Sequence, residues 1–176
     1  MSKNSSIQRL PVEVDPFRLV EQGRILEGKI PLGDFPRLQE MLVEETDKLV
    51  IVRLEFTFTD TRLPVIKGQI SVELEMLCNR CLKATTVTLQ TMPEVVLVSS
   101  DERAEQLQQG FDTWLVEDKQ VFLRDFIEDE LLLALPIVVA HEECTASRDL
   151  IEAIPDEAPQ QEQNPFAALK DLKLNK

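Results

Sequence analysis

The chain has 176 residues, of which 43% are hydrophobic, so it is long enough and apolar enough to form a folded core. Three cysteines are too few, and an odd number, for the disulfide scaffold of a small secreted protein. The 19 Lys and Arg residues against 32 Asp and Glu give a formal net charge of −13. The cysteine usage therefore favours a reducing compartment, and we expect a cytoplasmic protein. We expect no membrane span, because the longest nearly apolar stretch, residues 131–140, is too short and contains Pro136.

The acidic charge is concentrated in the second half of the chain. Residues 1–93 carry 12 basic and 13 acidic side chains, whereas residues 94–176 carry 7 basic and 19 acidic ones. Proteins that bind RNA through its phosphates normally offer clustered Lys and Arg, and the sequence has no such cluster. The charge therefore favours a basic protein as the partner, although acidity also simply keeps many proteins soluble.

The first 42 residues predict two short helices with a strand between them. Asp15 can cap a helix that begins at Pro16, and Gly23 can end it in the left-handed region that glycine tolerates. Residues 24–30 fit a strand. The same capping pattern, starting at Asp34, predicts a second helix whose apolar side would be formed by Phe35, Leu38, Met41 and Leu42.

The clearest pattern lies between residues 50 and 98, where apolar and polar side chains alternate. Residues 50–59 and 65–76 each place their apolar side chains on one face, and a polar turn joins them, which predicts a β-hairpin. Residues 82–91, rich in Thr and Val, and residues 95–98 predict further strands. Together these segments predict an antiparallel meander of three or four strands.

An amphipathic helix is predicted over residues 119–135, because apolar side chains recur three and four residues apart until Pro136. Residues 99–118 are expected to form an exposed loop with some helical content, anchored by Trp114. The leucines of the helix are expected to be buried. Its exposed side would be acidic, either simply solvated or facing a basic partner, and comprises Asp125, Glu128, Asp129 and Glu130.

The predicted architecture is a single α+β domain over residues 1–148, an antiparallel β-meander packed with a few helices. A flexible acidic linker is expected over residues 149–163, and a short C-terminal helix that acts as a docking motif over residues 164–176. In that motif Asn164 and Pro165 can cap and begin a helix that presents Phe166 and Leu169 on one face. It would dock on its own domain or on another molecule; the alternative is a frayed tail.

Residue patterns typical of enzymes are missing from the sequence. There is one His, no Ser/His/Asp arrangement of recognised spacing, and the five Gly are scattered singly, so no phosphate-binding loop is present. We therefore predict that the protein is not an enzyme.

The two thiols of Cys78-x-x-Cys81 have the spacing of half a tetrahedral zinc site. His141 and Cys144 repeat the two-residue spacing and could supply the other half. Such a Cys3His set would leave no open position, so the zinc would be structural. A redox motif is less favoured because strands are predicted on both sides of the thiols, and the remaining alternative is ordinary turn residues. One structural zinc is thus the only cofactor considered.

Three motifs occur in a distinctive order: Cys78-x-x-Cys81, the segment from Glu128 to Pro136, and the segment from Asn164 to Leu169. In this order and spacing the chain resembles the YceD family, the large ribosomal RNA subunit accumulation proteins. The resemblance extends from about Leu10 to Lys173. It implies a non-catalytic role in the synthesis, processing or stability of large-subunit (23S) ribosomal RNA, that is, in ribosome biogenesis, and it brings no catalytic residues.

The resemblance points to RNA, whereas the charge of the second half argues against phosphate contact. We therefore expect the protein to act through a basic large-subunit ribosomal protein, an assembly factor or a pre-ribosomal particle. One alternative is direct RNA binding by the near-neutral first half, and another is a structural zinc-binding adaptor. For direct RNA binding the candidate cations are Arg53, Lys67, Arg80 and Lys83.

Overall fold

The computed structural model describes residues 9–43, 47–107, 110–141 and 144, and the account below concerns these residues. The elements, in chain order, are β1 (Glu13–Val14), α1 (Pro16–Glu21), β2 (Ile25–Pro31), the 3-10 turn η1 (Leu32–Asp34), α2 (Pro36–Gln39), β3 (Leu49–Phe58), β4 (Pro64–Leu77), β5 (Ala84–Thr91), β6 (Glu94–Val98), α3 (Asp101–Leu107), β7 (Asp112–Leu115), β8 (Val121–Phe122) and α4 (Leu123–Leu133). The fold is mixed α+β, as predicted.

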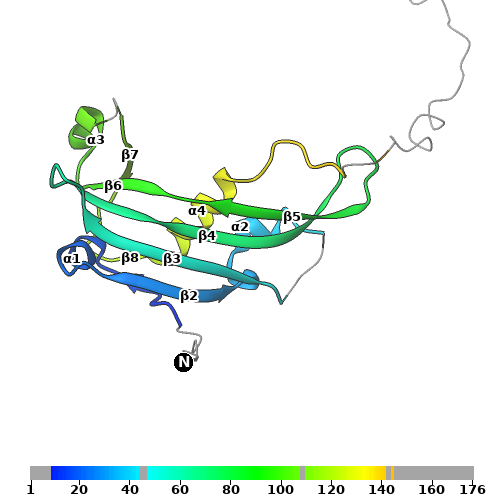
Figure 1. Ribbon diagram of the computed structural model, residues 1–176, viewed down its shortest axis with the longest axis horizontal. Coiled ribbons are helices and arrows are strands. Elements are labelled where there is room, and N and C mark those ends of the chain that lie inside the picture. Colours follow the sequence, from blue (N-terminus) through cyan, green and yellow to red (C-terminus); the bar gives the residue numbers. More distant parts are fainter. Residues whose placement is uncertain (1–8, 44–46, 108–109, 142–143, 145–176) are drawn as a thin grey trace, which may run out of the picture.

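A long, curved sheet forms the body of the protein (Figure 1). Its strands follow the order β2-β3-β4-β6-β7, and β5 also pairs with β4. The predicted hairpin is confirmed, since β3 and β4 pair antiparallel from Ile51 opposite Ser71 to Phe58 opposite Pro64. A separate two-stranded ribbon joins β1 to β8 and so ties the start of the chain to α4.

The strands β5 and β6 lie end to end along the same edge of β4. Thr91 pairs with Ile70 and Glu94 with Lys67, so both strands keep one register across the interruption at Met92 and Pro93. Proline has no backbone N–H to give to a ladder, which explains the break. The antiparallel meander is therefore confirmed, with β5 and β6 as one interrupted strand.

The sheet carries apolar side chains on both faces at one end, and this produces two cores. The large core lies under α1, α2 and α4 and includes Val52, Leu54 and Phe56 of β3. A small second core lies on the opposite face, where Ala104 and Leu107 of α3 pack near Val96. This division follows from the alternation of β6, whose residues Val95 and Leu97 join the first core and Val96 and Val98 the second.

The region between β6 and α4 contains more regular structure than the sequence predicted. The expected helical content is present as α3, but the sequence did not predict β7, which pairs parallel to β6 with Trp114 opposite Leu97. Trp114 does anchor this region, because its ring stacks on Phe126 of α4 with centroids 4.6 Å apart. The pair fixes the new strand against the helix that lies on the main core.

The two N-terminal helices differ in how they are capped. At α1 the side chain of Asp15 accepts a hydrogen bond from Arg18 N at 3.0 Å, and Gly23 has a φ of +58°, as predicted. The predicted second helix is present as α2, but its predicted cap was wrong, because Asp34 ends the 3-10 turn and Phe35 takes the cap position without a side-chain cap bond. Of the predicted apolar side, Phe35 and Leu38 are buried, whereas Met41 is half exposed.

The predicted helix before Pro136 is present as α4, but it begins at Leu123 and not near residue 119, because Val121 and Phe122 pair with β1 as strand β8. Leu131 is fully buried, whereas Leu133 is 82% exposed, so the burial expected for the leucines holds only in part. None of the helices in the part of the chain that the structure describes is long and apolar enough to cross a membrane. The linker predicted over residues 149–163 and the docking motif predicted over residues 164–176 lie outside the described residues.

Candidate metal centre

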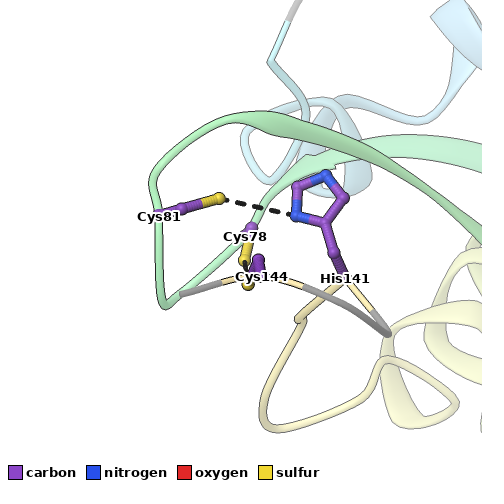
Figure 2. A group of neighbouring side chains, drawn as sticks. All are labelled: Cys78, Cys81, His141 and Cys144. Carbon is purple, nitrogen blue, oxygen red and sulfur yellow. Dashed lines mark hydrogen bonds between the residues drawn. The ribbon is translucent and has the colours of Figure 1, made fainter. Parts of the chain in front are cut away.

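The first half of the candidate site is the turn that joins β4 to β5. Cys78 follows β4 directly, and its N–H donates to Lys83 O at 2.9 Å. Leu82 N donates to Cys78 O at 2.9 Å, and Leu82 adopts a φ of +56°, which closes the turn. The tight turn brings Cys78 and Cys81 close together, and the sulfur of Cys81 points toward His141 while that of Cys78 points toward Cys144 (Figure 2).

The second half is the segment that follows α4. Val139 N donates to Oδ1 of Asn79 at 2.7 Å, and Asn79 N donates to Val139 O at 2.7 Å. This reciprocal pair fastens the segment to the turn between the two cysteines and places His141 and Cys144 beside them. The guanidinium of Arg80 adds a third tie, since it donates to Cys144 O at 2.6 Å.

The four predicted ligands converge. Their donor atoms all lie within 4.8 Å of one another, with Cys78 and Cys144 sulfurs 3.6 Å apart and Cys81 Sγ 3.5 Å from Nδ1 of His141 (Figure 2). In a tetrahedral zinc site two bound sulfurs lie about 3.8 Å apart, and a sulfur and a nitrogen about 3.5 Å apart. The group therefore has the size and the donor types of a closed, four-coordinate metal site, and it could bind a metal ion.

The hydrogen bonds of His141 favour the tautomer that a metal requires. Nε2 lies 3.1 Å from the carbonyl oxygen of Ala84, and a carbonyl can only accept, so Nε2 carries the hydrogen. The lone pair is then on Nδ1, the atom that faces Cys81. A backbone carbonyl that orients a histidine in this way is the usual outer-shell partner of a metal ligand.

The thiols differ in their acid–base behaviour. Burial raises the pKa of the Cys78 thiol, but hydrogen bonds from the surrounding backbone, first at Cys81 and then at Arg80, outweigh burial and lower that pKa to about 5. The pKa of Cys144 is raised instead, by burial and by the neighbouring thiols. Because a metal binds thiolates, Cys78 is already in the ligating form at neutral pH.

The four carboxylates predicted to form an exposed acidic side of α4 are not equivalent. Glu128 is only 2% exposed, so its assignment to the exposed side was wrong. Its Oε1 accepts hydrogen bonds from the backbone N–H groups of Arg37 at 2.8 Å and Leu38 at 3.1 Å, and its Oε2 lies 2.9 Å from Nε of Arg37. Glu128 therefore caps α2 and supplies the carboxylate that Asp34 was expected to provide.

The other three carboxylates remain at least partly accessible. Asp129 is exposed and forms an ion pair with Arg37 at 2.7 Å, and Asp125 is exposed. Glu130 is half-buried, and its pKa is raised by burial and by the charges of Asp112 and Asp129. The acidic surface of α4 is thus reduced to Asp125 and Asp129 with part of Glu130.

The cations proposed for direct RNA contact are dispersed. Arg53 forms an ion pair with Glu27, and Lys67 with Glu94, both on the sheet. Arg80 is held at the Cys/His group by the carbonyl of Cys144. These three side chains therefore do not form one basic surface.

Two contributors to these sites were not found from the sequence. Asn79 could have been noticed, because an Asn inside a Cys-x-x-Cys turn commonly bonds to backbone. Arg37 offered no local signal, since its contact with Glu128 spans 91 residues of sequence. Both act by joining segments that are far apart in the chain.

The fold and the site define a class: a small α+β protein in which a Cys3His group able to bind a metal joins a β-hairpin turn to the segment after the last described helix. The family model described as "Large ribosomal RNA subunit accumulation protein YceD" matches residues 66–173, and the chain belongs to this family. A protein of that name from Haemophilus influenzae is 28% identical over 170 residues, which cover 94% of this chain and 97% of the relative. No solved structure matches the chain.

Proposed function

We propose that the protein is a cytoplasmic, non-catalytic ribosome biogenesis factor that supports accumulation of large-subunit ribosomal RNA by binding a basic ribosomal protein or assembly factor. Membership in the YceD family supports the role in ribosomal RNA accumulation. The observation that carries the choice of partner is the charge of residues 94–176, with 19 acidic against 7 basic side chains. Such a chain repels phosphate and attracts cationic polypeptide.

The contact surface for that partner is proposed to combine two parts of the acidic half. One part is the exposed side of α4, with Asp125, Asp129 and part of Glu130. The other is the C-terminal motif Asn164, Pro165, Phe166 and Leu169, whose apolar side chains would fold against the partner. Glu128 has no part in this surface, because its carboxylate is buried under α2.

Binding assays in which the salt concentration is varied test the partner directly. The full chain should bind basic large-subunit ribosomal proteins with an affinity that falls as salt rises, and should bind purified ribosomal RNA weakly at physiological salt. Deleting residues 164–176 should weaken the protein complex. Tight RNA binding that is lost when Arg80 and Lys83 are replaced would favour direct RNA contact instead.

We further propose that the Cys3His group holds one zinc ion with a structural role. Zinc bound there would fasten the segment after α4 to the β4–β5 turn and so fix where the acidic tail leaves the domain. The group would be filled by four protein ligands, which leaves no position for a substrate. The proposed role of the zinc is therefore to hold these two segments of the chain together.

Metal analysis of three variants, two at His141 and one at Cys81, tests this proposal. His141→Cys preserves a four-ligand set and should retain about one zinc per chain, whereas His141→Ala and Cys81→Ser should lose most of it. Less than about a tenth of an equivalent in the reduced wild-type protein would contradict the proposal.

A further inference from the structure

A groove lies along the outer edge of β2, far in sequence from the Cys/His group. It has a volume of about 690 Å³ and is walled on one side by the N-terminal segment and on the other by the ends of β2 and β3. The N-terminal wall is fixed in place, because β1 pairs with β8 and Leu123 N donates to Val12 O at 3.1 Å. Its apolar lining includes Leu10, Ile30 and Leu49. We refer to this feature as the N-terminal groove.

The N-terminal groove is basic although the protein as a whole is strongly acidic. Arg9, Lys29 and Arg124 line it, against a single carboxylate, Asp34. All three cations are exposed, and none of them has an ion-pair partner among the described residues. Apolar walls with three unpaired cations suit a ligand that is itself apolar and acidic.

The net charge of −13 favours an acidic ligand that is tethered to the protein over one that is free in solution. A separate polyanion such as RNA is repelled by the whole molecule before it reaches three cations. An acidic segment of the same chain avoids this penalty, because tethering gives it an effective concentration on the order of millimolar. The groove is therefore better suited to an intramolecular ligand.

Residues 149–157, Asp-Leu-Ile-Glu-Ala-Ile-Pro-Asp-Glu, have the required chemistry. They carry four carboxylates and no base, interleaved with Leu150, Ile151 and Ile154. Three cations opposite four carboxylates, and aliphatic side chains opposite an aliphatic wall, give complementarity in both charge and polarity.

The length of the chain allows the contact. Extended by two residues beyond Ile51 opposite Ser71, the register of β3 and β4 places Leu49 level with Glu73, which is five residues before Cys78. At about 3.4 Å per residue along a strand and about 4.8 Å between strands, the edge of the groove is roughly 20 Å from the Cys/His group. Cys144 lies at that group, with its sulfur 3.6 Å from that of Cys78. Residues 145–149 span about 17 Å when extended, and the rest of the segment extends well past the edge.

We propose that residues 149–157 dock intramolecularly in the N-terminal groove, with their carboxylates on Arg9, Lys29 and Arg124. The contact returns the acidic tail to the start of the chain. It covers the three cations in the free protein, and it does not depend on the ribosomal role proposed above.

Photo-crosslinking in the full chain tests the proposal. The photoreactive residue p-benzoylphenylalanine is placed at Val12, a 68% exposed position on the wall of the groove, and for comparison at Met92, which is 73% exposed and lies outside it. After irradiation, peptides joined to residues 149–157 should form in at least about fivefold higher yield from Val12 than from Met92. The yield from Val12 should fall severalfold in 1 M salt, which screens the ion pairs.

Charge reversal supplies the matched control. Arg124→Glu should remove most of the crosslink, while leaving α4 intact because a glutamate is favourable in the first turn of a helix. Adding Glu152→Arg to that variant should restore it. Equal yields from Val12 and Met92, or no effect of Arg124→Glu, would overturn the proposal. Mixed isotope-labelled chains that crosslink between molecules would also overturn it and identify a second copy as the occupant.

Discussion

Replacing Glu128 tests the contact that joins α2 to α4. In Glu128→Gln the amide oxygen can still accept the N–H groups of Arg37 and Leu38, which both bond to Oε1, and only the interaction with the Arg37 side chain is lost. In Glu128→Ala all of these bonds are lost, and the N–H of Leu38, a fully buried residue, is left without an acceptor. The two variants therefore separate the cap from the ion pair.

The two losses differ in size. The Arg37 side chain is 50% exposed, so losing its ion pair should cost about 1 kcal/mol after screening by solvent. A buried backbone N–H left unsatisfied, here that of Leu38, costs about 1–3 kcal/mol, so Glu128→Ala should lose roughly 2–4 kcal/mol in total. For a domain of this size about 1 kcal/mol moves the melting temperature by roughly 2–4 °C.

Thermal and urea unfolding of the two variants give the measurement, and Asp125→Ala is the control, because Asp125 is an exposed carboxylate of the same helix. We expect wild type and Asp125→Ala to be similar, Glu128→Gln to be slightly less stable, and Glu128→Ala to be much less stable. If Glu128→Ala costs no more than Asp125→Ala, the capping role of Glu128 is refuted. If Glu128→Gln is as unstable as Glu128→Ala, the ion pair dominates and the reasoning on the cap is wrong.

Three further outcomes follow from the structure. In metal-free, reduced protein the thiolate absorbance of Cys78 should titrate near pH 5 and should be missing from Cys78→Ser. Because this pKa lies below the ordinary value of 9.0, the unfolded chain binds more protons than the folded chain between these two pH values. The free energy of unfolding should therefore rise with pH across that window. A titration near pH 9 would contradict it. Glu130→Gln should raise the unfolding midpoint at neutral pH. The pKa of Glu130 is raised in the folded state, so its ionised form destabilises the fold at any pH above that pKa. A lowered midpoint would contradict this explanation. Gly68→Ala should destabilise markedly in chemical denaturation, since the added methyl group would meet Arg53 O and the Leu54 side chain of the paired strand β3. Wild-type stability of this variant would show that the two strands can move apart to admit the methyl group.

Local patterns in the sequence were sufficient for the elements whose burial is set by neighbours in the chain. Strict alternation identified β3 and β4 because one face of each packs on the helices, and Asp15, Pro16 and Gly23 marked α1 through backbone chemistry alone. Spacing also identified the Cys/His group. The turn and the segment after α4 each supply two ligands, and the reciprocal bonds of Asn79 bring them together.

Features decided by long-range contacts could not be read in this way. Glu128 has the chemistry of a solvated residue, and only the arrival of α2, 91 residues away in sequence, makes its burial favourable. The short strand β7 has too little alternation to be recognised, and its parallel pairing with β6 depends on Trp114 reaching Phe126 of α4. One wall of the N-terminal groove is likewise held by a long-range contact, since β1 pairs with β8 across the fold.

The proposed partner can be tested most directly by purifying the tagged full chain from its own cells and treating the bound material with ribonuclease. If the protein acts through a basic polypeptide, large-subunit ribosomal proteins or an assembly factor should stay bound after the RNA is digested, and should be released by high salt. Loss of every partner on ribonuclease treatment, together with recovery of ribosomal RNA crosslinked directly to the chain by ultraviolet light, would contradict the account.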